Sequence, residues 1–255
     1  MPLLFIWIAL LPGFLAGLAV NYFADVLPIT RRLTRPLCLE CKDAPRLIDY
    51  LLLRPCADCG KKQTWRHWIV LCVFTLASLL TWLHPAHRLG YGMGLVLLVY
   101  LGVVVVIDLE YRVILSEVSL AGLILGGAIG ILTRGFATTF YGGLAGFGAM
   151  LVLYFFGELY TRWLRWRQPD RYEGANPSDD EVALGFGDVN LTGILGLILG
   201  WPVIVAGLLA GIVAGGLASL IYILALVLVK RYRISTAIPY APFLVLGAVV
   251  FLYGF

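Results

Sequence analysis

Long stretches without a charged residue follow one another along the whole chain, and they constrain its fold more than any other feature. A helix needs about 20 apolar residues to cross a bilayer, and somewhat shorter runs are completed by flanking Trp, Tyr and small polar residues. The stretch 189–229 is about twice too long for one crossing, and Gly200-Trp201-Pro202 within it can turn the chain back. The pattern predicts an all-α, polytopic membrane protein with about eight transmembrane helices. The stretches are 1–24, 68–83, 91–107, 118–133, 138–157, 189–229 and 234–255.

The composition supports this prediction. Of the 255 residues, 61% are hydrophobic and 13% are charged, which is more apolar material than a water-soluble core of this size can bury. The first apolar stretch has no basic segment ahead of it and is interrupted by Pro12-Gly13. We therefore expect a retained helix there rather than a cleaved signal peptide.

The basic residues are distributed unevenly between the loops. Of the 19 Lys and Arg, nine lie within 28–67, four within 158–184, three within 230–233 and one, Arg112, beside Asp108, whereas Arg88 and Arg134 fall on the opposite side. Because cytoplasmic loops carry the excess of positive charge, the loops after the first, third, fifth and seventh helices are predicted to be cytoplasmic, with both termini outside. The net charge of +4 is thus a topology signal and gives no reason to propose a nucleic-acid partner.

Four cysteines form two Cys-x-x-Cys pairs in the first basic loop. Cys38 and Cys41 are separated from Cys56 and Cys59 by fourteen residues, a spacing that can close a tetrahedral structural zinc site. The cytoplasm would keep the thiols reduced, and metal binding could replace the apolar core that this loop lacks. Incidental thiols or a redox pair are the alternative. We predict a first transmembrane helix (1–27), a zinc-ribbon-like cytoplasmic loop (28–67) and a seven-helix membrane core (68–255).

Two aspartates stand at the edges of predicted spans, where a carboxylate is costly and usually functional. Asp108 ends a valine-rich apolar run, and Asp188 follows Gly185, Phe186 and Gly187 at the start of another span. Glycines beside an Asp let the backbone approach closely. The charge pattern places both carboxylates on the same membrane face.

Two carboxylates held close together cannot both ionise easily, so they share a proton, and one acts as base while the other acts as acid. The base can deprotonate a water that attacks a peptide carbonyl, and the acid can protonate the carbonyl oxygen. We therefore favour peptide-bond hydrolysis by Asp108 and Asp188. The structural alternative makes Asp188 a helix N-terminal carboxylate and pairs Asp108 with Arg112. For Glu117 and Glu158 we favour a structural or interfacial role.

Taken in order, these features resemble the bacterial type IV prepilin peptidases, intramembrane aspartic proteases with a Gly-x-Gly-Asp motif. The resemblance rests on Gly185-Phe186-Gly187-Asp188, on the Asp108 segment, on the paired cysteines, and on the closing Ile238-Pro239-Tyr240-Ala241-Pro242-Phe243. Asn21 and Leu27-Pro28 also match residues that follow the family's first helix. This chain departs from the family pattern at Asn190, Leu115, Leu18 and Val26, and its cysteine pairs are closer together than in many members.

The resemblance implies a function and a location. It implies removal of a short basic leader from pilin or pseudopilin precursors at the cytoplasmic face of the bacterial inner membrane. Asp108 and Asp188 match the family's catalytic aspartates, and the four cysteines match its metal-binding-like set. Many members also methylate the new N-terminus with S-adenosylmethionine, an activity associated with the first cytoplasmic loop. The departures weaken the expectation of methylation more than that of cleavage.

An acidic segment precedes the glycine turn that carries Asp188. A basic leader needs a negatively charged surface, and most of the predicted cytoplasmic face is basic, so this segment is the candidate substrate-binding site. A solvated loop is the alternative. The candidate residues are Glu173, Asp179, Asp180 and Glu181.

Three other functions remain open from the sequence. A proton- or cation-coupled transporter could use the same aspartates, although no internal repeat supports it. A methyltransferase that keeps only the activity of the first loop rests on the resemblance alone. A membrane-anchored zinc module that binds partners would leave the aspartates without a role.

Overall fold

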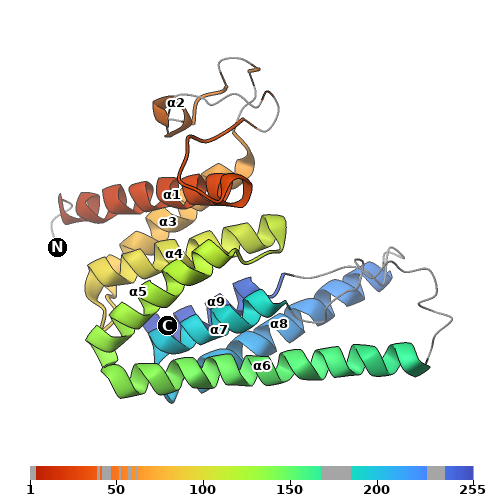
Figure 1. Cartoon of the computed structure of the whole chain (residues 1–255). Helices are drawn as coiled ribbons and strands as arrows, with labels where there is room; N and C mark the ends of the chain where they lie inside the picture. Colours follow the sequence, from red (N-terminus) through yellow and green to blue (C-terminus); the bar gives the residue numbers. More distant parts are fainter. Residues whose placement is uncertain are drawn as a thin grey trace. The chain divides into compact units, whose positions relative to one another are not determined.

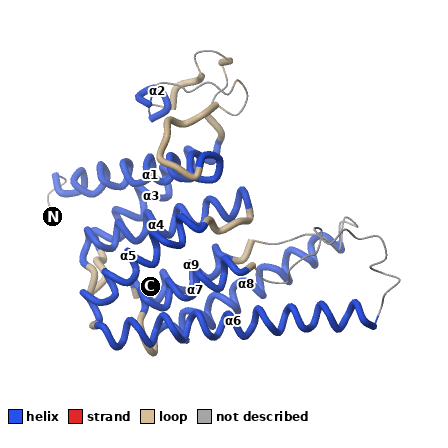
Figure 2. The backbone as a smooth tube through the Cα atoms, in the orientation of Figure 1, coloured by secondary structure: helices blue, strands red, loops and turns tan. Residues whose placement is uncertain are grey.

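The computed structural model describes residues 4–38, 41, 47–51, 53–56, 59–60, 63–167, 185–228 and 239–254. Within these ranges the regular structure is entirely helical, as Figure 2 shows. The described residues contain eight helices of 13 to 32 residues and the five-residue helix α2, joined by loops. The chain divides into two compact units, Met1–Tyr111 and Arg112–Phe255.

The first unit consists of three long helices and α2. Helix α1 packs on both α3 and α4. The approach to α3 is close because α1 presents glycine there: a Cβ on Gly13 would lie 2.6 Å from Cβ of Ser78. The Ser78 hydroxyl also donates a hydrogen bond of 2.7 Å to the carbonyl of Ala9. The helices are α1 (Leu4–Thr30), α2 (Leu47–Leu51), α3 (Trp65–Leu83) and α4 (Gly90–Tyr111), and Figure 1 labels them.

The second unit is built around α7. This helix contacts α5, α6, α8 and α9, and nine of its 14 residues are buried. Its lack of charge apart from Asp188 suits that central position. The helices of this unit are α5 (Ser116–Arg134), α6 (Phe136–Arg167), α7 (Phe186–Leu199), α8 (Val203–Leu228) and α9 (Ala241–Tyr253).

Glycines bring the backbones of α6 and α7 together. A Cβ on Gly142 of α6 would lie 2.4 Å from the carbonyl oxygen of Gly196 on α7, and one on Gly146 would lie 2.3 Å from that of Thr192. Small residues that allow such close packing are typical of helix interfaces within membranes. Side chains at these positions would push apart the two helices on which the unit depends.

We expect Gly142→Ala to lower the stability of the protein because its methyl group would meet backbone, which cannot move aside as a side chain can. Overpacking of this kind typically costs about 1–3 kcal/mol. The matched control is Gly148→Ala on the same helix, where an added Cβ meets nothing within 4 Å. Thermal unfolding in detergent should show a lower midpoint for Gly142→Ala and an unchanged or higher midpoint for Gly148→Ala. Equal midpoints would contradict the packing argument.

The helical membrane fold predicted from the sequence is confirmed. Six described helices are long and apolar enough to cross a membrane, and α7 and α9 are shorter apolar helices. Gly200, with φ of 69°, ends α7 where the sequence predicted a turn. The main difference in bounds is that α1 continues beyond the apolar run to Thr30. Asp25, one residue beyond the charge-free run 1–24, lies within this helix, as the predicted bounds of 1–27 also have it.

Candidate active site and metal centre

Asp188 lies in the first turn of α7. Gly185 is the N-cap residue with an extended backbone, and the amide of Asp188 donates a hydrogen bond of 3.0 Å to the carbonyl of Gly185. Gly187 allows a close approach, because a Cβ there would lie 2.8 Å from Cβ of Ile114. The carboxylate is turned back toward the start of the helix, since a Cβ on Gly185 would lie 3.6 Å from Oδ2 of Asp188. The glycines of the motif thus let α7 begin against Ile114 with a half-buried carboxylate in its first turn.

Asp108 lies near the end of α4 in the first unit. Its side chain is buried, with 6% exposure, while Leu109, directly after it, is 55% exposed. The helix ends at Tyr111, and Arg112 has a φ of 54°. Asp108 is therefore the last buried residue of α4 before the helix reaches an exposed end. The two candidate aspartates belong to different compact units.

Tyr240 is a neighbour of Asp188 that the sequence did not identify as a site residue. Its ring packs against α8, where a Cβ on Gly215 would lie 2.8 Å from Cε2 of Tyr240. Burial and the negative charge of Asp188 raise the pKa of Tyr240 above its usual value. The sequence could have indicated this residue, because Tyr240 lies within the 238–243 motif that resembles the family.

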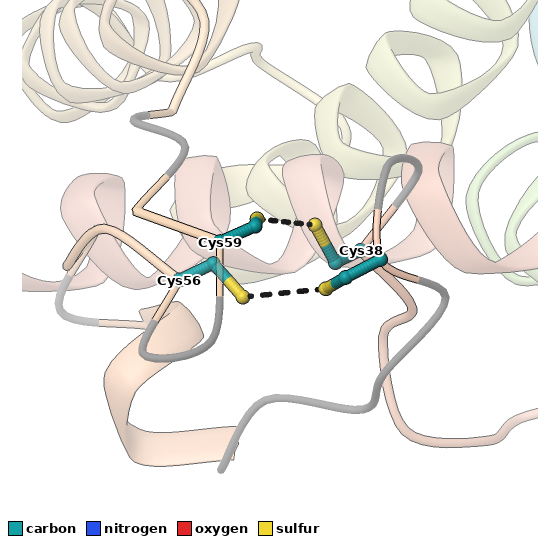
Figure 3. Close-up of side chains that lie close together, drawn as sticks. Cys38, Cys56 and Cys59 are labelled. Carbon is teal, nitrogen blue, oxygen red and sulfur yellow. Dashed lines mark hydrogen bonds between the residues drawn. The ribbon is translucent and has the colours of Figure 1, made fainter.

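The structure brings the four predicted cysteine ligands together. Sγ of Cys38 lies 3.5 Å from Sγ of Cys59, and Sγ of Cys41 lies 3.7 Å from Sγ of Cys56. In Figure 3 the labelled side chains of Cys38, Cys56 and Cys59 point toward one another, and dashed lines mark the two contacts. All four sulfur atoms lie within 4.8 Å of one another. The contacts are too long for disulfides, whose sulfur atoms are about 2.05 Å apart.

This geometry fits a tetrahedral zinc ion. Zn–S bonds of about 2.3 Å place the corners of a tetrahedron about 3.8 Å apart, close to the two shorter sulfur contacts. Four thiolates would fill the coordination shell and leave no open position, so the residues suit a structural metal. A metal at this position would join the chain before α2 to the chain after it.

A cluster of polar residues joins α1, α2, α3 and α4, and the sequence pattern did not predict it. We call Asp25, Tyr50, Arg66, His67 and Glu110 the Arg66 cluster. The Arg66 guanidinium forms ion pairs with Asp25 of α1 and Glu110 of α4. Tyr50 of α2 donates a hydrogen bond to Asp25, and Nε2 of His67 lies 2.9 Å from Oδ2 of Asp25. One feature of the sequence could have indicated this cluster: Asp25 is a carboxylate within a predicted transmembrane helix, four residues after Asn21.

Two acidic residues outside these sites lie on α5 and α6. Glu117 is in the first turn of α5, and Glu158 pairs with Arg162 one turn later on α6. The four candidate substrate-binding residues lie outside the described part of the chain. They are Glu173, Asp179, Asp180 and Glu181.

The fold and these sites define a multi-pass helical membrane protein that carries carboxylates near helix ends and a cysteine cluster suited to a metal. Residues 95–220, just under half of the chain, match the model of the type IV leader peptidase family, and the matched part includes both aspartates. The protein is accordingly a protease of the leader peptidase kind. No curated protein and no solved structure matched the chain.

Proposed function

We propose that the protein is a prepilin leader peptidase that cuts basic leaders from type IV pilin-like precursors, with Asp108 and Asp188 as its catalytic residues. The observation that carries the proposal is the family match over 95–220, which includes both aspartates. The geometry within each unit supports it, because Asp108 is buried at the end of α4 and Asp188 begins α7 behind two glycines. The family match gives no support to a transporter.

The proposed chemistry uses two carboxylates that share one proton. The ionised aspartate takes a proton from water, and the resulting hydroxide attacks the scissile carbonyl carbon. The protonated aspartate donates its proton to the carbonyl oxygen, which gives a diol intermediate. The proton gained by the first carboxylate then passes to the amide nitrogen, the C–N bond breaks, and a diol hydroxyl returns its proton to the second aspartate. This scheme requires no metal, so the cysteine cluster has a structural role in it.

The proposal places the active site at the cytoplasmic face of the inner membrane. Support comes from the distribution of charge. The loops that hold most of the Lys and Arg are predicted to be cytoplasmic, and the same pattern puts Asp108 and Asp188 at that face. The precursors named by the resemblance carry basic leaders, so the leader would approach from that side.

Co-expression with a candidate precursor tests the proposal directly. The precursor should have a basic leader, a glycine at the cleavage point and an apolar segment after it. We expect mass spectrometry to show loss of the leader when wild-type protein is present and the intact precursor when it is absent. An intact precursor in the presence of wild-type protein, repeated over several precursors, would contradict the proposal. N-methylation with S-adenosylmethionine stays a prediction from the resemblance, and the same spectra show whether the product carries one methyl group.

We expect the acidic segment before Asp188 to hold the basic leader. Changing Asp179 and Asp180 to Asn and Glu181 to Gln should raise KM and flatten its dependence on salt, because salt screens exposed charge pairs. The maximal rate should change much less, since these residues would contact the leader and not the scissile bond. Glu158→Gln on α6 is the matched control, because it also removes an exposed negative charge. Equal KM and equal salt dependence in mutant and wild type would contradict a role in leader binding.

A further inference from the structure

The Arg66 cluster holds the end of the helix that carries Asp108. Glu110 is the next-to-last residue of α4, and Asp108 lies two positions before it. The last turn of a helix has carbonyl groups without intrahelical partners and opens more easily than the middle. The ion pair from Arg66 to Glu110 ties this turn to α3 at the position where the candidate aspartate needs a fixed orientation.

Arg66 is itself held in place on several sides. Its side chain is 16% exposed and is shared between the carboxylates of Asp25 and Glu110. The adjacent His67 also contacts Asp25, and the carbonyl of His67 accepts a hydrogen bond of 3.1 Å from Asn21, which is almost fully buried. A guanidinium group held by two carboxylates has a fixed orientation, whereas a charged side chain on the open surface samples many.

An exposed ion pair of the same chain provides the contrast. In the pair Arg162–Glu158 the arginine side chain is 73% exposed, and such pairs contribute about 0–1 kcal/mol. Partly buried ion pairs also contribute little net stability, because the loss of hydration offsets their attraction, but they can specify one geometry. The Arg66 cluster is therefore better suited to fixing a position than to stabilising the fold.

Tyr50 connects the cysteine loop to this cluster. It belongs to α2, which lies between the two cysteine pairs in the sequence, and its hydroxyl donates a hydrogen bond to Asp25. Burial and the charge of Asp25 raise the pKa of Tyr50 far above its usual value. Tyr50 therefore remains a neutral donor throughout the physiological pH range.

We propose that Arg66 is a positioning residue of this protease, which acts through Glu110 on the last turn of α4 and so fixes the carboxylate of Asp108. Asp25 anchors Arg66, and Tyr50 and His67 orient Asp25. This inference rests on the proposed catalytic role of Asp108. It assigns no contact between Arg66 and the substrate.

Kinetics of single and double variants test the inference. We expect Arg66→Gln and Glu110→Gln each to lower kcat about ten- to a hundredfold, the range expected when a mutation remote from the reacting atoms misplaces a catalytic group. KM for a precursor peptide with a basic leader should change little. The double variant should be no slower than the slower single variant, because both changes remove the same ion pair. Arg66→Lys should recover part of the lost kcat, since it keeps a charge that can reach one carboxylate at a time.

Three results would overturn the inference: additive losses in the double variant, an effect confined to KM, or a normal kcat in both single variants. Arg162→Gln is the matched control and should behave as wild type. If Arg66→Gln does not accumulate in the membrane, Glu110→Gln carries the test, because its side chain is 37% exposed and tolerates an amide. Asp108→Asn, measured beside these variants, separates the two ideas: full activity there contradicts the proposed function, whereas an inactive Asp108→Asn with normal Arg66 and Glu110 variants contradicts the positioning role alone.

Discussion

Asp108→Asn and Asp188→Asn should each abolish leader cleavage while the protein still accumulates in the membrane. An amide keeps the size and shape of the carboxyl group but can neither take a proton from water nor give one to the carbonyl oxygen. We expect each change to cost several orders of magnitude in rate. The double variant should be little slower than either single variant, because residues that act as one unit have non-additive effects. The measurement is the rate of leader loss with one precursor at equal amounts of protein.

Asn190→Asp and Glu158→Gln are suitable controls for these variants. The first adds a carboxylate one half-turn after Asp188, and the second removes a carboxylate whose partner is Arg162. Neither should reproduce the complete loss. Near-normal cleavage by either Asp108→Asn or Asp188→Asn would show that the two aspartates are not the catalytic pair, and Asp188 would then be a helix N-terminal carboxylate only.

Purified protein should contain about one zinc ion per chain, because four thiolates complete a single tetrahedral shell. Replacing both Cys38 and Cys41 by Ser should reduce the zinc content to near zero, since two ligands remain and the site is open. The loop should then become sensitive to proteolysis, because metal binding contributes the folding energy that few apolar residues supply there. Metal analysis by mass spectrometry and limited proteolysis are the two measurements.

Cys72→Ser provides the control for the metal prediction. Cys72 is a free cysteine on α3 outside the cluster. Its replacement should leave the zinc content unchanged. Wild-type protein prepared without chelators and found to be free of zinc would contradict the assignment, and the cysteine cluster would then be a set of reduced thiols.

The helices could be predicted because each apolar run has a physical reason to cross a membrane. The turn at Gly200 and the separate helices α7 and α8 followed from the length of one run and the residues that interrupt it. The helix ends were less predictable, since α1 continues to Thr30 and not only to the predicted residue 27. The partners of Asp25 within α1 were not predictable either: hydrogen bonds and ion pairs with Tyr50, His67 and Arg66 accommodate this carboxylate.

The cysteine cluster could also be predicted, because local spacing brings the ligands of each pair together. The Arg66 cluster could not, since its members come from four helices and no short motif links them. Their partners are set by packing, and residues such as Glu110 and Tyr50 look in the sequence like ordinary boundary residues. Tyr240 was predictable only in part. Its motif could be recognised in the sequence, but the effect of the Asp188 charge on Tyr240 could not be predicted from it.

The shortness of α7 has a consequence for the bilayer itself. Its 14 residues span about 21 Å at 1.5 Å per residue, against a hydrocarbon thickness of about 30 Å. Its neighbour α9 has 13 residues and is similarly short. Such hydrophobic mismatch is relieved by local thinning of the lipid or by water that follows the polar ends of the helices inward. A carboxylate in the first turn of α7 can therefore be hydrated below the level of the surrounding headgroups, and hydrolysis at membrane depth then requires no aqueous channel across the full width of the protein.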